Sequence, residues 1–455
     1  MTLDVVILAA GQGTRMRSRK PKVLHTLAGK PMVRHVIDTA AGLGADKLHV
    51  VIGHGGDAMR QTLGDAGVHF AVQEEQLGTG HAVAQTLDQL GHDKVLVLYG
   101  DVPLIRRETL AALLGRVDEE HMGLLSVILE EPNGYGRILR NDEGRVVAIV
   151  EHKDATEAER AVKECNTGIM AMTAAQLRRW LPQLSADNQQ GEYYLTDVIA
   201  MAAAEGVGIV TAQPAAPVEV EGVNNRLQLA RLERAYQQGI AERLMTEGVA
   251  LADPARIDVR GTLTCGHDVE IDVGCVFEGD VELGEGVRIG PYCLIRDSRL
   301  GAETVVEAHS VIDQAVAAGY NQIGPFARLR PGTQLAIKAK VGNFVETKNA
   351  RVGEGSKINH LSYVGDARLG QGVNVGAGTI TCNYDGVNKH RTEIGDGAFI
   401  GSNSALVAPV SIGAGATVGA GSTISKDVAD NALAVSRARQ ISKADWPRPT
   451  KSAKD

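Results

Sequence analysis

The carboxyl-terminal half of the chain repeats an aliphatic residue every six positions, and this period limits the possible folds more than any other feature. From about residue 251 the pattern reads LGEGVR, IGPYCL, IGPFAR, VGNFVE, VGEGSK, VGAGTI, IGDGAF, IGAGAT and VGAGST. A period of six fits neither an α-helix nor a simple hairpin, and it is typical of a parallel β-helix of hexapeptide repeats. In such a solenoid each aliphatic side chain points into a narrow core, and each coil stacks only on its neighbours.

Three stretches depart from this period. Residues 313–322 (DQAVAAGYNQ) and 381–393 (TCNYDGVNKHRTE) interrupt it, and the tail ISKADWPRPTKSAKD abandons it. Insertions into a solenoid project as loops on one face, often the binding face, so we expect both interruptions to project. The tail is basic and contains proline, and two readings stay open for it: folding over a neighbouring subunit, or disorder.

The amino-terminal half alternates β-rich runs with helix-like segments. The strand candidates are LDVVILAA, KLHVVIG, KVLVLYGD and GLLSVIL. Between them lie MVRHVIDTAAGLG and GHAVAQTLDQL, in which apolar residues recur at helical spacing. Alternation of this kind predicts βαβ units and a mostly parallel sheet, with ligands beyond the carboxyl ends of the strands. Residues 224–248 read as one long helix that stops at Gly248. We therefore expect an α/β domain over 1–225, a helical linker over 226–248 and a β-helix domain over 249–455.

Composition restricts the partners and the compartment. The formal net charge is -8, which disfavours nucleic-acid binding by the chain as a whole. The five cysteines are odd in number and lack CxxC spacing, which indicates reduced thiols in a cytoplasmic protein. Neither a secretion leader nor an apolar run of about 18 residues is evident, so we expect no membrane partner.

The stretch VVILAAGQGTRM, residues 5–16, carries the first chemical motif. It lacks the third glycine of a dinucleotide fingerprint and the terminal GK[ST] of a P-loop. Glycines let a backbone approach a phosphate closely, and Arg15 and Lys22 add positive charge. From the loop alone, an ordinary glycine turn with surface cations remains the alternative.

With the following Pro21-Lys22, this stretch resembles the signature of sugar-1-phosphate nucleotidylyltransferases. The similarity extends through EQLGTGHA, YGDVPL, GYGRI, VEHKDA, NTGI, QGEYYLTD and VEGVNNR. Together with the hexapeptide half, nearly the whole chain resembles the bacterial bifunctional N-acetylglucosamine-1-phosphate uridylyltransferase / glucosamine-1-phosphate N-acetyltransferase family. The resemblance implies a Rossmann-like α/β domain, a left-handed parallel β-helix and a homotrimer. It also implies acetyl transfer from acetyl-CoA to glucosamine 1-phosphate, then UMP transfer from UTP to N-acetylglucosamine 1-phosphate with release of pyrophosphate.

The resemblance assigns most of the first site. Asp101 follows the strand KVLVLYG, where an acidic residue can hold a metal or simply cap a turn; the family pattern favours Mg²⁺, with Asn224 as the second ligand. Arg15 and Lys22 are implied to stabilise the departing pyrophosphate. The implied UDP-N-acetylglucosamine site comprises Leu8, Ala9, Ala10, Gly11, Lys22, Gln73, Gly78, Thr79, Tyr99, Gly100, Asp101, Gly136, Glu151, Asn166 and Asn224.

The second site is assigned in the same way. His360 is implied to be the base, because imidazole titrates near neutrality and the attacking amine must be uncharged. The substrate-binding positions of the acetyltransferase match Arg330, Lys348, Tyr363, Asn374, Asn383 and Tyr384, and the acetyl-CoA contacts match Ala377, Ser402, Ala420 and Arg437.

Two other functions fit the sequence. In the first, the β-helix is a non-catalytic assembly and regulatory module attached to a nucleotidylyltransferase; the joint presence of Arg330, Lys348, His360, Asn383 and Tyr384 argues against it. In the second, the enzyme uses a different nucleotide or hexosamine.

Overall fold

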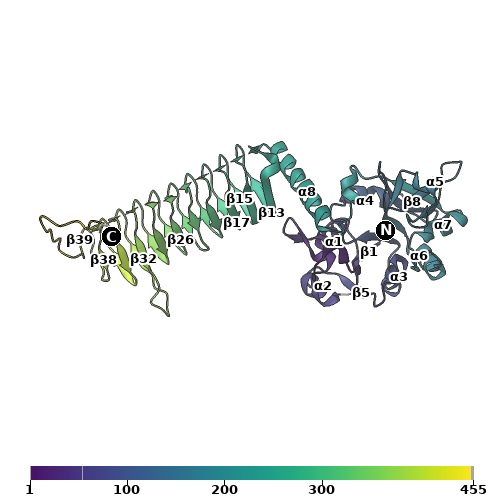
Figure 1. Ribbon diagram of the computed structural model, residues 1–455, viewed down its shortest axis with the longest axis horizontal. Helices are drawn as coiled ribbons and strands as arrows, with labels where there is room; N and C mark the ends of the chain where they lie inside the picture. Colours follow the sequence, from purple (N-terminus) through teal and green to yellow (C-terminus); the bar gives the residue numbers. More distant parts are fainter. Residues whose placement is uncertain (1, 54, 452–455) are drawn as a thin grey trace. The chain divides into compact units, whose positions relative to one another are not determined.

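A computed structural model describes residues 2–53 and 55–451, which form two compact units divided between Gly239 and Ile240 (Figure 1). Each unit has its own hydrophobic core. Among the described residues, no helix combines the length and the apolar character that crossing a membrane requires.

The first unit is a twisted, mixed sheet covered by helices on both faces. Its strands lie in the order β11 (Gly208–Ala212), β7 (His121–Ile128), β10 (Glu164–Thr173), β6 (Lys94–Tyr99), β1 (Leu3–Leu8), β4 (Lys47–Ile52) and β5 (His69–Val72). The four predicted strands correspond to β1, β4, β6 and β7. The sheet is parallel except at β10, which runs antiparallel to both β6 and β7. A hairpin of β8 (Arg137–Arg140) and β9 (Val146–Val150) extends from β10.

Alternating side chains of the strands face two helical layers. In β1, Val5 and Ile7 face one core and Val6 and Leu8 face the other, which is the period of two expected of a strand. The first core includes residues of α1 (Met32–Gly42), α2 (Gly56–Leu63) and α4 (Arg107–Leu114), and the second includes residues of α3 (Thr79–Ala84), α6 (Ala174–Trp180) and α7 (Asp197–Ala204). The predicted helix at the end of this unit is α8 (Arg226–Thr246), and Gly248 beyond it has a φ of 100°.

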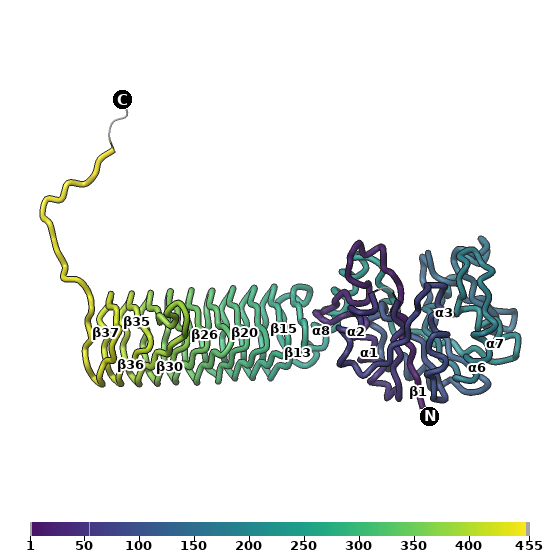
Figure 2. Tube along the Cα trace, turned by 90° about the horizontal axis from the view of Figure 1, so that it is seen from below, coloured from purple at the N-terminus to yellow at the C-terminus, as the bar shows by residue number. Residues whose placement is uncertain are grey.

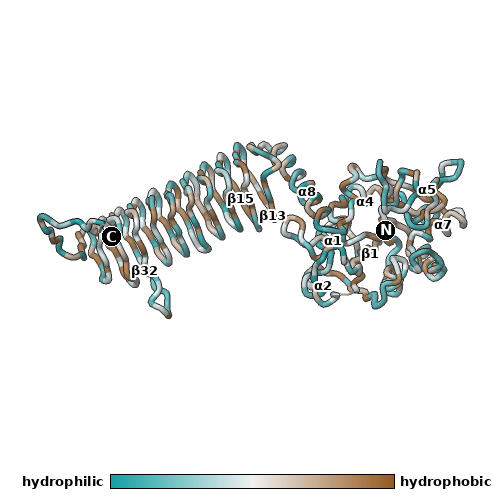
Figure 3. Tube along the Cα trace, viewed as in Figure 1, coloured by the Kyte–Doolittle hydropathy of each residue, from teal (hydrophilic) through white to brown (hydrophobic). Residues whose placement is uncertain are grey.

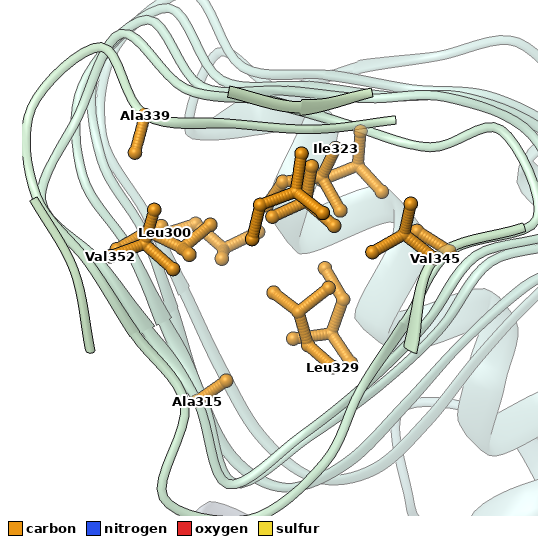
Figure 4. Packing of buried hydrophobic residues seen from close by; sticks show 14 of the residues in the cluster. Leu300, Ala315, Ile323, Leu329, Ala339, Val345 and Val352 are labelled. Atoms are coloured by element: carbon orange, nitrogen blue, oxygen red, sulfur yellow. The ribbon is translucent and has the colours of Figure 1, made fainter. Parts of the chain in front are cut away.

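The second unit is a parallel β-helix, as the six-residue period predicted (Figure 2). Core residues stack in register from coil to coil: Val306 on Ile323, Ile323 on Val341 and Val341 on Ile358, so one coil takes 17 or 18 residues. Figure 4 shows aliphatic side chains from all three walls meeting inside the coil. Ala241 and Leu244, near the end of α8, join this core at its first coil.

The two interruptions of the period have different outcomes. Residues 313–322 do not project, so that prediction was wrong. They form a regular coil with β20 (Val311–Asp313), β21 (Val316–Ala317) and β22 (Gln322–Ile323) in register with their neighbours. The buried Asn321 closes its corner, because its Nδ2 donates to the carbonyls of Ala336 (2.7 Å) and Ala339 (2.9 Å).

Residues 381–393 do project, as expected. Between β32 (Ile380–Cys382) and β33 (Thr392–Ile394) the chain forms a polar hairpin closed by an antiparallel bridge of Tyr384 with Lys389 (Figure 3). The tail leaves the last coil after β39 (Leu433–Ala434), and as far as residue 451 it has no regular secondary structure (Figure 2). Residues 452–455 at its end lie outside the described part of the chain.

Candidate active sites

A cavity of 350 Å³ opens beyond the carboxyl ends of β1 and β6 in the first unit. This is the edge of a parallel sheet at which ligands are expected. Ten of the residues that the sequence assigned to the first site line it: Leu8, Ala9, Ala10, Gly11, Lys22, Gln73, Gly78, Thr79, Tyr99 and Asp101. Gly100 lies beside it, where its N–H donates to the carbonyl of Leu8 (2.9 Å) and joins the two strand ends.

Two glycines in this region have conformations that other residues rarely adopt. Gly13 has a φ of 62°, and a Cβ placed on it would lie 2.5 Å from the Cβ of Lys22. Gly78 has a φ of 109°, and its Cβ would lie 2.6 Å from the carbonyl oxygen of Tyr193. Both glycines therefore let neighbouring chain segments close on the cavity.

The N–H groups of Gly11 and Gln12 have no acceptor within the described part of the protein. They belong to the loop that forms one wall of the cavity, immediately after β1. Free backbone donors on a glycine-rich loop are suited to phosphate oxygens.

Two oxygens and two cations meet at one side of the cavity. The Lys22 ammonium contacts Asp101 Oδ2 and also lies 3.2 Å from Asn224 Oδ1. Arg15 Nη2 donates to the same Asn224 oxygen at 2.9 Å. The segment with Asn224 is held in place because the N–H of Val223 donates to the carbonyl of Asp101 (2.9 Å).

These contacts test whether the predicted metal ligands fit an ion. Asp101 and Asn224 converge on one positive charge, the Lys22 ammonium, so both oxygens lie within reach of a single cation position. Within residues 2–53 and 55–451, no group of three His, Cys, Asp or Glu side chains forms a metal cluster. A pair of protein oxygens fits Mg²⁺, which keeps waters and takes further ligands from phosphates.

The residues assigned to the sugar lie on the hairpin side of the sheet. Glu151 accepts a hydrogen bond from Thr196 Oγ1 (3.3 Å), and its carboxylate lies 3.3 Å from the Cβ position of Gly136. The N–H of Asn166 donates to the carbonyl of Gly136 (2.9 Å), so the three assigned positions are neighbours. Burial raises the pKa of Glu151. Burial, together with the charges of Glu151 and Asp101, also raises the pKa of Tyr99, so this phenol is a hydrogen-bond donor at neutral pH.

Sequence reasoning gave no role to four residues of the cavity wall, Val23, Gln76, Ala82 and Glu192. Gln76 Nε2 donates to the carbonyl of Ala10 (2.6 Å), so it holds the glycine loop against the cavity. Gln76 and Glu192 both belong to motifs that carry the family resemblance, and those motifs were the available signal.

In the second unit, His360 ends β28 (Lys357–His360) at a corner of the prism. Its Nδ1 lies within hydrogen-bond distance of Oδ1 of Asn343, its register partner one coil earlier. Because an amide oxygen only accepts, this contact favours the tautomer with the proton on Nδ1 and a free lone pair on Nε2. The sequence analysis did not include Asn343, since only the 17-residue register brings it to His360.

The four residues assigned to acetyl-CoA form a column with His360. Strand register places Ala377, Ser402 and Ala420 on successive coils above it. Arg437, at the start of the tail, donates from Nη1 to the carbonyl of Ala420 (2.7 Å). With about 4.8 Å between coils, the column from His360 to Arg437 spans roughly 19 Å. The side chains between its two ends are small.

Positive charges gather at the next corner, around Lys348. Lys389 of the projecting hairpin contacts it, and hydrogen bonding and repulsion by Lys389 lower the pKa of Lys348, with a further contribution from Arg330. Arg330 Nη1 also pairs with Glu346 (2.8 Å). Lys389 was missed by sequence reasoning, because a lysine within an irregular insertion has no pattern around it.

The remaining assigned residues connect these two corners. Tyr363 begins β29 (Tyr363–Gly365), whose last residue is the register partner of Lys348, so β29 runs between the His360 corner and the cationic corner. Asn383 Nδ2 contacts Asp366, and Tyr384 is exposed on the projecting hairpin. Asn374 starts β31 (Asn374–Val375), on the face that leads to the His360 corner.

Known proteins resemble both units. A family described as MobA-like NTP transferase domain matches residues 5–195, and one described as bacterial transferase hexapeptide (six repeats) matches residues 391–426. A bifunctional protein GlmU of Chromohalobacter salexigens is 72% identical over 453 residues, which cover 100% of both chains. Proteins of the same name from Marinobacter nauticus and Alkalilimnicola ehrlichii are 61% and 60% identical, over 99% and 98% of this chain and 99% and 96% of theirs. The chain therefore belongs to the GlmU family of bifunctional enzymes, which synthesise UDP-N-acetylglucosamine.

Proposed function

We propose that the cavity of the first unit transfers UMP from UTP to N-acetylglucosamine 1-phosphate with the residues described above. The observation that carries this assignment is the convergence of Asp101 and Asn224 on one cation position beside a glycine loop with free N–H donors. A Mg²⁺ ion held there would neutralise phosphate charge and align the triphosphate. Asp101 and Asn224 would hold this ion, and Lys22 and Arg15 would stabilise the charge on the departing pyrophosphate.

The rest of the cavity supplies orientation. Gln73 is buried, and its Nε2 donates to the carbonyl of Gly78 (3.0 Å), which leaves its own carbonyl oxygen for the pyrimidine edge. Glu151, Asn166 and the backbone at Gly136 hold the sugar. Attack by the sugar-phosphate oxygen on the α-phosphate then depends on alignment and charge neutralisation rather than on a covalent intermediate.

In the second unit, His360 Nε2 removes a proton from the amine of glucosamine 1-phosphate. The amine attacks the thioester carbonyl of acetyl-CoA, the carbon–sulfur bond breaks, and the thiolate leaves with a proton. Arg330, Lys348 and Lys389 hold the sugar phosphate, while Tyr363, Asn374, Asn383 and Tyr384 contact the sugar. The small residues above His360 give the pantetheine arm a smooth path, and Arg437 holds the far end of the cofactor.

The acetyl site is shared between chains in a homotrimer. A seam between parallel prisms would give the corner at His360 the enclosing walls that a binding site needs. The side chains along one corner, Tyr292, Phe326, Phe344 and Leu361, are each at least 48% exposed and form an apolar surface that association would cover. The enzyme works in the cytoplasm, where all five of its cysteines, which are free, would stay reduced.

The alternative role for the β-helix, assembly without catalysis, explains neither the column above His360 nor the cationic corner. An enzyme for a different nucleotide or hexosamine shares this architecture, so the products decide between the two. The wild-type protein with glucosamine 1-phosphate, acetyl-CoA, UTP and Mg²⁺ should yield N-acetylglucosamine 1-phosphate, then UDP-N-acetylglucosamine, identified by mass.

Two variants test the division of labour. Asp101→Ala should abolish most uridylyl transfer and leave acetyl transfer intact, whereas His360→Ala should lower acetyl transfer by roughly 10²–10⁴-fold and leave uridylyl transfer intact. Mixed trimers of His360→Ala and Arg437→Ala should regain acetyl transfer at roughly a quarter of their sites if each site uses two chains. Mixed trimers no more active than either variant alone would refute the shared site.

A further inference from the structure

One corner of the β-helix changes from bulky to small side chains at the coil that carries His360. At and below this level the corner residues are Tyr292, His309, Phe326, Phe344 and Leu361, all with positive φ and one to each coil. We name these five residues the corner ladder. Its rings stack nearly parallel, with centroid distances of 5.3, 4.9 and 5.1 Å along the series.

Above His360 the same corner carries glycines and one asparagine in place of bulky apolar side chains. Strand register continues the ladder into Gly378, Asn403 and Gly421. Gly378 has a φ of 76°, and a Cβ on it would lie 2.2 Å from Oδ1 of Asn403, so a larger residue there would strain the backbone and displace the Asn403 side chain. The column of small residues above His360 and this corner run side by side. The column ends at His360, and the corner reaches its first bulky apolar side chain at Leu361.

The position of Leu361 matters because it follows the proposed base directly in the chain. Under the proposed function, the pantetheine arm descends the small-residue column and its thioester stops at His360. The acyl chain is the part of the molecule that continues past the thioester. Directly below His360 in the column lies its register partner Asn343. The corner residues beside these two are Leu361, on the His360 coil, and Phe344, one coil below.

We propose that Leu361, backed by Phe344, forms the end wall of the acyl site and restricts the transferred group to acetyl. The proposal rests on the assignment of the acetyl-CoA column. A pocket that closes against one extra methylene discriminates by about 10- to 200-fold. Leu361 takes no part in proton transfer, so its removal changes which thioester is used more than the rate with acetyl-CoA.

The test compares three thioesters on full-length variants with glucosamine 1-phosphate as acceptor. Leu361→Gly removes the wall and suits the backbone, because Leu361 has a φ of 51° that glycine adopts freely. We expect the ratio of kcat/KM for propionyl-CoA to that for acetyl-CoA to rise at least tenfold, and butyryl-CoA to become a measurable substrate. Leu361→Phe continues the aromatic series upward and should lower kcat/KM for acetyl-CoA itself.

The matched control is Phe326→Gly, the same kind of change at a positive φ two coils below, which should leave the thioester ratio unchanged. Sedimentation of every variant checks that assembly is intact. An unchanged ratio in Leu361→Gly with acetyl transfer retained would overturn the proposal. If Leu361→Gly fails to assemble, Leu361→Phe becomes the test. A kcat/KM for acetyl-CoA equal to that of the wild type in Leu361→Phe would refute the proposal that Leu361 forms the end wall. Failure of the proposed function is a different result: wild-type protein that forms no N-acetyl product from acetyl-CoA.

Discussion

Lys389 offers the sharpest test of the cationic corner, because it belongs to the projecting hairpin and yet contacts Lys348. Three positive charges converge there, those of Lys348, Lys389 and Arg330, and Lys389→Met removes one of them. A hydrogen bond to a charged group contributes about 1.5–3 kcal/mol when shielded, and exposed pairs contribute ~0.2–1 kcal/mol. The corner is open to solvent, so we expect the KM for glucosamine 1-phosphate to rise by about tenfold, between these limits.

The same variant should change the pH dependence in a stated direction. Lys389 lowers the pKa of Lys348, so the Lys348 ammonium loses its proton at a lower pH than an ordinary lysine does. Phosphate binding needs the charged form, so affinity in the wild type should decline early as the pH rises. Without Lys389 the pKa of Lys348 returns upward, and the decline should move to higher pH even though KM at neutral pH is worse.

The assay is steady-state acetyl transfer, with KM for glucosamine 1-phosphate measured across pH 7 to 10. Lys338→Met removes an exposed lysine at another corner of the same prism and serves as the control. Unchanged KM in Lys389→Met, or an alkaline decline that stays where it is in the wild type, would refute the reasoning.

Three further variants test other contacts. Gly13→Ala forces an unfavourable φ and a clash with Lys22, so uridylyl transfer should fall steeply and unfolding by urea should show about 1–3 kcal/mol of lost stability; full uridylyl activity would contradict this. Asp4 is fully buried; burial opposes its ionisation, but hydrogen bonds from side chains and backbone N–H groups hold its pKa below the usual value. The ionised Asp4 carboxylate stabilises the folded protein above the pKa that it has in the unfolded chain, and this stabilisation is lost as the pH falls through its pKa in the folded protein. Asp4→Asn should therefore lower the free energy of unfolding at pH 7 and lower it progressively less toward pH 3. An equal decrease at both pH values would contradict this prediction. Asn343→Leu should lower kcat for acetyl transfer by about tenfold through loss of the His360 tautomer, with uridylyl transfer as the internal control; an unchanged kcat would show that the imidazole needs no partner.

The repeat could be predicted from sequence because a six-residue period is a local pattern with one structural solution. The exception at 313–322 shows the limit of that argument. Those residues look irregular in sequence, but a coil of 17 residues closes as well as one of 18 when Asn321 satisfies the corner carbonyls. The spacing of residue types in a sequence does not reveal such hydrogen bonds.

Contacts made across register or from irregular chain were not predictable in the same way. Asn343 reaches His360 only through coil stacking, and Lys389 reaches Lys348 only because the hairpin turns back to that corner. Strand β10 was not among the strand candidates, and its antiparallel course could not be read from composition, since strand direction is decided by the hairpin and connections around it. Motif resemblance, by contrast, placed ten residues around one cavity without any knowledge of these contacts.

The two ends of the β-helix are closed differently, and this has a consequence for how activity is lost under stress. At the first coil, Ala241 and Leu244 of α8 pack into the core, whereas the last coil ends in the two-residue strand β39 and the irregular tail. A solenoid held together by nearest neighbours opens from its weaker end. Ser402, Ala420 and Arg437 lie within the last coils, so mild heating should fray the coenzyme column first. Acetylation should then fail while hydrogen exchange still reports an intact fold around Ile289 and Ile295, deep in the early coils.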